Sequence, residues 1–331
     1  MSENDSRFRE ALAQIAEVAS QAINGGDQSF HNGHDHDHEG SSHEASKDKL
    51  VCSPKSLPQR LLIKAADTAT KINPANGVVV ASAQAAMGLV LTPQHIAVMV
   101  QKYWGQRSRQ FTVSFMETTP PDLRARIVSH MNAWNKTSAM SFVETRANGD
   151  VRISRGPGGY WSYLGTDILL IPKNQQTMNL QDFTMNTEER EYKRVVRHET
   201  GHTLGFPHEH MRKALISRID PQKAYDFFLN TYGWPKTTVD QQVLTPLDEK
   251  SLMSTPPDQT SIMCYQLPGS ITRDGQPIIG GLDINATDAM FAANIYPKTT
   301  EPSASTNAKP SHDAPYMSED WGEANDPEIR V

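Results

Sequence analysis

Cysteine is scarce in this chain of 331 residues, which contains only Cys52 and Cys264. One bridge is therefore the maximum, and a framework of several disulfides is excluded. No segment approaches the roughly 20 apolar residues of a membrane-spanning helix. The net charge is −6, so the basic stripe typical of nucleic-acid-binding proteins is missing as well. Composition thus predicts neither a membrane nor a nucleic acid as partner, and it leaves the oligomeric state open.

The first residues of the chain are polar and have no apolar stretch like that of a secretory signal. This predicts a cytoplasmic protein or one exported by a route that uses no N-terminal leader. Apolar residues make up 37% of the chain, which is low for a fully folded protein of this length. Part of the chain is therefore expected to lie outside any packed core.

Composition divides the chain into four parts. Residues 1–50 are expected to form a helix, at 5–24, and then a disordered segment rich in histidine. Residues 51–105 are expected to be helical and to serve as a pro-segment or as a packing extension. Residues 106–298 form the predicted catalytic domain. Residues 299–331 are rich in Pro, Ser, Asp and Glu and are expected to be a disordered tail.

The histidines of the first part lie within residues 27–49, among Asp, Glu, Gly and Ser. They could bind zinc, nickel or copper, or they could belong to a solvated acidic linker. Metal storage is therefore one interpretation of this segment.

Hydrophobic periodicity predicts the secondary structure. Strands are expected at residues 111–115, 141–145, 150–155, 166–172 and 177–180. Helices are expected at 60–72, 92–105 and 284–296, along a stripe from Leu123 to Trp134, and from Asn186 into the histidines described next. Glu189, three residues after Asn186, would complete a capping box. The chain from Gly205 to residue 284 is expected to be rich in loops.

One short motif carries the chemistry. His198 and His202 are one helical turn apart, so their imidazoles face the same way and can hold one zinc ion. Glu199 lies between them and can reach a water in the open position of the metal. Gly205 lets the chain leave the helix in a left-handed conformation, which can bring His208 round as the third ligand. The alternative is a helix whose histidines are packed or solvated and bind no metal.

A second motif, Ser261-Ile262-Met263-Cys264-Tyr265, lies downstream. Together with the histidines it resembles the methionine turn of the metzincins, which forms a floor under the zinc ligands.

Further residues narrow the resemblance to the astacin family and its bacterial and fungal branch. Phe206, Glu209 and Arg212 extend the histidine motif to H-E-x-x-H-x-x-G-F-x-H-E-x-x-R. Tyr265 stands two residues after Met263, as in that family.

The resemblance implies an α+β, two-lobed catalytic domain. Its upper lobe would hold a mixed, twisted sheet and a long active-site helix, and its irregular lower lobe would end in a C-terminal helix. The implied activity is that of an endopeptidase with one catalytic Zn²⁺ ion, acting on proteins or peptides, with Glu199 as general base. Tyr265 would stabilise the oxyanion, and Gly205 and Met263 would have structural roles. Glu209 is tied to the mature N-terminus in processed members, or it could instead pair here with a basic side chain.

The chain departs from the family at several positions. Residues 159–165, G-Y-W-S-Y-L-G, resemble another astacin motif, but Tyr160 and Cys264 stand where other members have a cysteine and a histidine. The two disulfides of those members are therefore absent. Cys52 could occupy the open zinc position and hold the enzyme latent, but a free thiol in a linker is the favoured interpretation of a single cysteine. The alternative function is that of a non-catalytic zinc-binding protein on the same scaffold.

Overall fold

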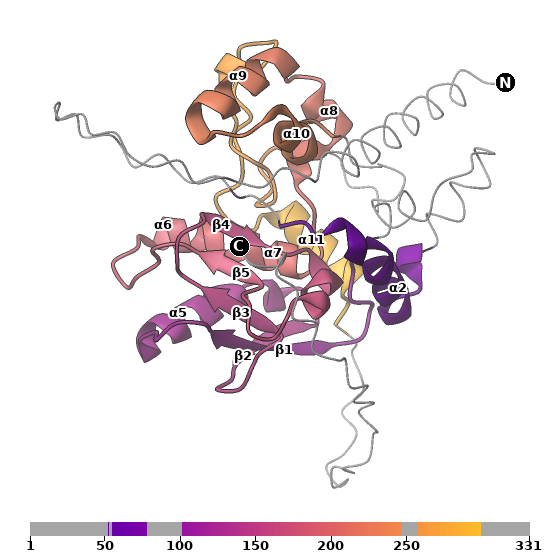
Figure 1. Cartoon of the computed structure of the whole chain (residues 1–331), viewed down its shortest axis with the longest axis vertical. Coiled ribbons are helices and arrows are strands. Elements are labelled where there is room, and N and C mark those ends of the chain that lie inside the picture. Colours follow the sequence, from indigo (N-terminus) through magenta and orange to yellow (C-terminus); the bar gives the residue numbers. More distant parts are fainter. Residues whose placement is uncertain (1–51, 53–54, 78–100, 246–256, 299–331) are drawn as a thin grey trace, which may run out of the picture.

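The computed structural model describes residues 52, 55–77, 101–245 and 257–298 (Figure 1). The helix expected at 5–24, the histidine-rich segment and the C-terminal tail lie outside these residues, as does most of the helix expected at 92–105. Its described end, residues 101–105, is not helical. No helix in the described part is long and apolar enough to span a bilayer. The boundaries of the four parts stay a prediction.

A five-stranded mixed sheet, in the order β2-β1-β3-β5-β4, forms the centre of the larger lobe (Figure 1). Its strands are β1 (Arg109–Phe115), β2 (Met140–Glu144), β3 (Val151–Ser154), β4 (Tyr160–Ser162) and β5 (Met178–Leu180). Neighbouring strands are parallel, except that β4 runs antiparallel to β5 at the edge of the sheet. The predicted mixed sheet is confirmed, although its edge strand β4 was not expected.

The strand expected at residues 166–172 is wrong. This segment forms the 3₁₀ helix η3 (Gly165–Leu170). Gly165 has a φ of 48°, in the left-handed region, and a Cβ atom there would overlap the backbone of Lys102. The backbone N–H of Thr166 donates to the carbonyl of Lys102 at 3.1 Å. The contact with Lys102, which is distant in sequence, favours a helical turn here. An apolar run alone gives no sign of such a contact, so it predicted a strand.

The helix that carries the histidines is continuous. It consists of α6 (Glu189–Glu191), the π-helical turn η4 (Tyr192–Val196) and α7 (Arg197–Thr203). It begins at Glu189 rather than at Asn186, and the expected capping box is not formed. The Glu189 carboxylate instead accepts a hydrogen bond from Arg126, on a neighbouring helix, at 3.0 Å.

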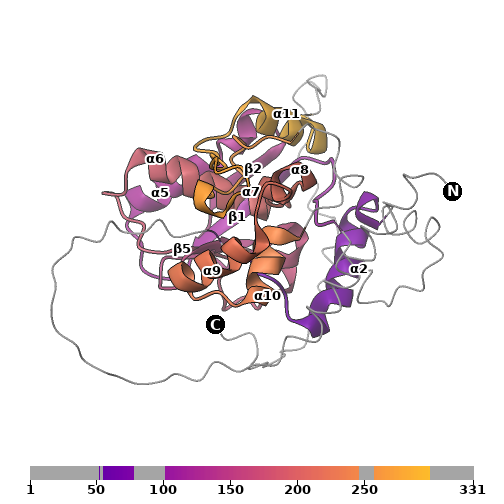
Figure 2. The same cartoon turned by 90° about the horizontal axis from the view of Figure 1, so that it is seen from above.

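Two further helical segments cover the larger lobe. α5 (Pro121–Met131) and the 3₁₀ turn η2 (Trp134–Lys136) follow the predicted apolar stripe. The 3₁₀ turn η1 (Gln59–Leu61) and α2 (Leu62–Ile72) confirm the helix expected at 60–72. α2 lies at the flank of the larger lobe in both views and packs against η3 (Figure 2).

The smaller lobe is helical, so the expectation of a loop-rich chain from Gly205 to residue 284 is wrong in this part. Its elements are η5 (Glu209–Met211), α8 (Lys213–Ile216), α9 (Pro221–Tyr232), α10 (Lys236–Val239), η6 (Asp240–Leu244) and η7 (Gly269–Ile271). The side chain of Asp220 caps α9, and Gly233, with a φ of 68°, ends it. α11 (Ala286–Ile295) is the expected C-terminal helix and begins with a capping box.

Two apolar clusters form the core, one in each lobe. The larger cluster lies between the sheet and its helices and includes Met263, whereas the smaller one includes Cys52 and Tyr265. The methionine turn therefore lies where the two clusters meet.

Candidate metal centre

The three histidines of the motif converge at the boundary of the lobes. Nε2 of His208 lies 3.2 Å from Nε2 of His198 and 3.0 Å from Nε2 of His202. All three side chains are buried. Ligand nitrogens at the corners of a tetrahedron around zinc, with Zn–N bonds of about 2.05 Å, lie about 3.3 Å apart. The spacing of these atoms therefore fits a zinc ion.

The backbone fixes the orientation of two of these rings. Nδ1 of His198 donates to the carbonyl of Ile262 at 2.6 Å, and Nδ1 of His202 donates to that of Phe206 at 2.8 Å. Their Nε2 atoms then carry lone pairs that face His208, because a neutral imidazole has one N–H. Burial lowers the pKa of His198 to about 4 and that of His202 further below its usual range. Facing lone pairs in neutral rings repel unless a cation lies between them, so the donor set suits a metal.

Gly205 returns the chain toward the metal centre after the helix. Its φ is 91°, and its N–H donates to the carbonyl of His202 at 2.8 Å. The N–H of Phe206 donates to the carbonyl of Gly201 at 2.9 Å. This left-handed turn directs His208 back over α7, as the glycine in the sequence indicated.

Glu199 lies beside the histidines and is buried, with one unpartnered carboxylate oxygen, Oε2, among the described residues. Burial is the main cause that raises its pKa to about 8, while a hydrogen bond with Cys52 and the charge of Arg194 act in the opposite direction. A carboxylate that is poorly solvated and has a free oxygen is suited to accept a proton.

Tyr265 lies against the same group. Its ring centroid is 4.1 Å from that of His208, and its hydroxyl donates a hydrogen bond to the carbonyl of Cys52. The phenol therefore points into the centre and is more than a packed aromatic side chain.

Met263 lies directly beneath the active-site helix. A Cβ atom on Gly201 would overlap the Met263 sulfur, which shows how closely the methionine turn approaches α7. The carbonyl of Met263 accepts a hydrogen bond from the N–H of Glu209 at 2.8 Å. The turn thus contacts both the helix of His198 and His202 and the segment that follows His208.

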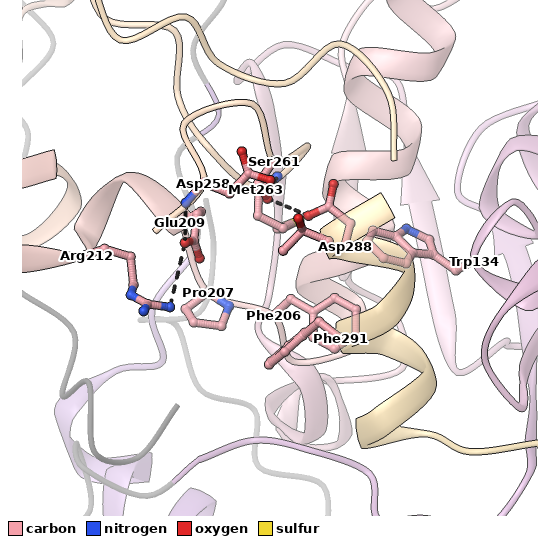
Figure 3. Close-up of a pocket in the computed structure, with 11 residues that line it drawn as sticks. Trp134, Phe206, Pro207, Glu209, Arg212, Asp258, Ser261, Met263, Asp288 and Phe291 are labelled. Atoms are coloured by element: carbon pink, nitrogen blue, oxygen red, sulfur yellow. Dashed lines mark hydrogen bonds and ion pairs between the residues drawn. The ribbon is translucent and has the colours of Figure 1, made fainter. Parts of the chain in front are cut away.

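Glu209 lines a pocket together with Arg212 and Asp258 (Figure 3). Its carboxylate lies 3.6 Å from the guanidinium of Arg212 and accepts a hydrogen bond from the N–H of Asp258 at 3.2 Å. Burial raises the pKa of Glu209 to about 7. Glu209 therefore has a basic partner, Arg212, which agrees with the expectation that it could pair with a basic side chain.

Cys52 lies beside the histidines, where the less favoured interpretation of the sequence had its thiol. Its Sγ atom lies 3.4 Å from Nε2 of His202, and the four potential ligand atoms of Cys52 and the three histidines lie within 4.8 Å of one another. Cys52 is buried, so the favoured interpretation of a thiol in a linker is wrong. A lone cysteine far before the first histidine carries no local signal, because only the folded chain brings the two together.

The segment that starts at Cys52 pairs with the edge of the sheet. Cys52 and Lys55 form parallel bridges with Tyr160 and Tyr163, and the N–H of Lys55 donates to the carbonyl of Ser162 at 3.3 Å. The ammonium group of Lys55 also lies 5.1 Å from the ring centroid of Trp161. Cys52 and Lys55 therefore occupy the edge of β4 next to the metal centre.

Comparison with known sequences decides the family. The sequence profile named Astacin, which describes a family of peptidases, matches residues 97–276, more than half of the chain. The chain belongs to the astacin family. This membership confirms the predicted resemblance, and the matched region is a zinc metallopeptidase domain. The assignment of this astacin to the bacterial and fungal branch stays a prediction.

Individual relatives agree with this membership. Zinc metalloproteinase nas-27 of Caenorhabditis elegans is 32% identical over 100 residues, which are 30% of this chain and 21% of that protein. This astacin thus matches about a fifth of the length of that relative.

Solved structures are similar as well. The structure of myroilysin matches 60% of this astacin and 97% of its own chain, with 28% identity and a TM-score of 0.56. A zinc-protease hatching enzyme of Oryzias latipes, high choriolytic enzyme 1, matches 58% of this chain and 92% of its own, with 22% identity and a TM-score of 0.41. The likeness to myroilysin agrees with the predicted α+β fold.

Proposed function

We propose that this chain is a zinc-dependent endopeptidase that is held latent by Cys52. His198, His202 and His208 would hold the ion, which supplies a Lewis acid and a water of lowered pKa when bound. The observation that carries the proposal is the convergence of three imidazoles, two of them oriented by backbone carbonyls, beside a buried carboxylate with a free oxygen.

Glu199 is the proposed general base. Its unpartnered Oε2 takes a proton from the attacking water as the oxygen of that water bonds to the peptide carbonyl carbon. When the C–N bond breaks, Glu199 passes the proton to the leaving amine. Burial raises the pKa of Glu199, which makes its carboxylate a stronger acceptor for the proton of the water. Before the C–N bond breaks, the Tyr265 hydroxyl donates a hydrogen bond to the oxyanion that the attack creates.

An extended protein or peptide substrate is expected to pair with the edge of β4, where backbone groups can bind it whatever its sequence. Cys52 and Lys55 occupy that edge, and the thiol lies close enough to the three histidines to be the fourth ligand of a tetrahedral site. Cleavage therefore requires that this segment leaves the site. A non-catalytic zinc-binding role gains no support, because it would not require the buried carboxylate of Glu199 beside the histidines.

The test is cleavage of a denatured protein by the full-length chain with zinc, with a chelator, and with zinc restored. Cys52→Ser is expected to raise the rate several-fold over the unaltered chain, and Cys52→Ser/Glu199→Gln to lower it at least about a hundredfold while one zinc stays bound. Cleavage that persists in the Glu199→Gln variant would refute the role of Glu199. Equal rates for Cys52→Ser and the unaltered chain would refute latency through the thiol.

A further inference from the structure

His210 is a buried histidine that the metal centre does not use. It lies on η5, two residues after His208, and its side chain is 0% exposed. Its ring stacks on that of Tyr265, with a centroid distance of 4.2 Å and an interplanar angle of 14°. A buried imidazole that lies flat against the tyrosine of the site is placed to control the orientation of that tyrosine.

The smaller lobe holds the ring of His210 in place. Nε2 of His210 lies 3.0 Å from the carbonyl oxygen of Gln242, and because a carbonyl only accepts, Nε2 carries the proton. Gln242 belongs to η6, whose Val243 is buried in the apolar cluster of the smaller lobe. The orientation of His210 is therefore set by the packing of the smaller lobe.

Tyr265 contacts two imidazoles with different geometry, and the rings of His208 and His210 also contact each other, with centroids 5.0 Å apart. The ring of His208 is tilted by 46° to the phenol, whereas that of His210 is almost parallel to it. A parallel face allows the phenol to slide in its own plane but opposes tilting out of that plane. The hydroxyl then stays directed at the metal centre, where it bonds the carbonyl of Cys52.

We propose that His210 is a positioning residue that acts through Tyr265. Its stacked ring keeps the phenol in the plane in which the hydroxyl reaches the reacting carbonyl. The catalytic part of this proposal rests on the proposed role of Tyr265 as oxyanion donor. The geometric part, that His210 orients Tyr265, does not depend on catalysis.

Two substitutions separate stacking from hydrogen bonding. His210→Phe keeps a flat ring but loses the bond to Gln242, and His210→Gln keeps a donor but loses the ring. In the full-length Cys52→Ser protein, His210→Gln is expected to lower kcat about tenfold with little change in KM, and His210→Phe only about twofold. In a Tyr265→Phe background, His210→Gln should cost less than about twofold, because the group through which it acts is gone.

A second readout requires no peptidase activity. In the full-length Cys264→Ser protein, the rate at which a thiol reagent modifies Cys52 reports how firmly Tyr265 holds the Cys52 carbonyl. His210→Gln and Tyr265→Phe should each raise this rate several-fold, the double variant no further, and His210→Phe much less. Zinc content is measured in parallel, and all variants are expected to bind one ion.

Multiplicative effects of His210→Gln and Tyr265→Phe on the labelling rate would overturn the proposal. So would a His210→Phe variant that is impaired as strongly as His210→Gln. If no variant cleaves protein, the proposed function fails, but the labelling rates still decide whether His210 orients Tyr265.

Discussion

At the scale of single residues, the metal centre is arranged by backbone carbonyls. His198 and His202 donate to the carbonyls of Ile262 and Phe206, so the direction of both Nε2 lone pairs is set by the methionine turn and by the turn after Gly205. Such hydrogen bonds fix the tautomer of a ligand and reduce the reorganisation that metal binding requires. A change that displaces either turn should therefore weaken zinc binding even when all three histidines are present.

Gly201 tests this dependence. The change Gly201→Ala places a methyl group into the Met263 sulfur and near the ring of Trp134, with buried neighbours on each side. We expect a loss of about 1–3 kcal/mol in the free energy of unfolding, as for other overpacked sites, and weaker zinc binding. Denaturant unfolding and zinc competition with a chromogenic chelator measure the two effects.

Gly156→Ala is the matched control, because its added Cβ would make only ordinary contacts, the nearest at 3.4 Å. It should change the free energy of unfolding by less than about 0.5 kcal/mol. If Gly201→Ala behaves like this control, the methionine turn does not support the helix in the way that the packing indicates.

Local sequence was sufficient to propose the histidines, because their spacing on a helix and the glycine after it fall within one short stretch of the chain. It was insufficient for Cys52 and His210. Cys52 meets His202 across 150 positions, and His210 meets Gln242 across 32. Neither contact belongs to a repeating pattern, so the hydrophobic periodicity of the sequence could not predict it.

At the scale of elements, some segments agree with the prediction from sequence and others do not. The strands of the sheet centre and α11 agree with expectation, whereas η3 and α9 do not. η3 is turned by the contact of Thr166 with Lys102. α9 does have an apolar face, since Ala224 and Phe228 are buried and Tyr225 and Tyr232 pack beside them. Its capping residue Asp220 was a further signal, so the sequence held the evidence for this helix although loops were expected there.

The position of α2 bears on the two roles proposed for residues 51–105. Ala65 and Ala69 on this helix are buried, and the side chain of Asn76 after it bonds the carbonyls of Ala69 and Tyr103, both at 2.9 Å. A pro-segment that detaches would not be expected to share its core with the catalytic domain. These contacts favour a packing extension that stays with the enzyme.

Ala69→Asp is the direct test of that role. A charge at this fully buried position should lower the free energy of unfolding by about 3 kcal/mol or more. Ile63→Asp introduces the same residue on the exposed side of α2 and should cost far less. Thermal unfolding of both full-length variants gives the comparison. An Ala69→Asp protein as stable as Ile63→Asp would mean that α2 detaches without unfolding the domain.

α11 is joined to the methionine turn by one carboxylate. Asp288 accepts hydrogen bonds from Ser261 Oγ at 2.5 Å, from the N–H of Ile262 at 2.9 Å and from the N–H of Asn285 at 3.0 Å. Asn at this position would turn an NH₂ group toward donors. We therefore expect Asp288→Asn to cost about 1–3 kcal/mol in the free energy of unfolding and to weaken zinc binding.

Asp226→Asn is the control for this change. Asp226 lies on α9 and accepts one exposed hydrogen bond, from Gln222 at 3.0 Å. Its substitution should leave both quantities nearly unchanged. A zinc affinity unaffected by Asp288→Asn would show that α11 supports the fold without acting on the metal centre.

At the scale of the whole molecule, the metal centre lies where the two lobes meet, and it should tie them together. α7 belongs to the larger lobe, Tyr265 and His210 pack with the smaller one, and Cys52 joins that second cluster from the start of the described chain. A ligand that binds only the folded state adds to stability by mass action, about 4 kcal/mol at a thousand times its dissociation constant. Removal of the ion should therefore loosen the lobes as well as abolish cleavage.

The number of zinc ions per chain separates the peptidase from a metal-storage protein. The described residues contain one cluster of metal-ligating side chains, that of Cys52 and the three histidines. The peptidase proposal therefore expects one tightly bound ion per full-length chain, and the same number after deletion of residues 27–49. His202→Ala should lose that ion in both proteins, because two histidines and a thiol hold zinc less well than four ligands. Metal analysis after gel filtration provides the count. Several ions that disappear with residues 27–49, and one that survives His202→Ala, would instead favour storage by the histidine-rich segment.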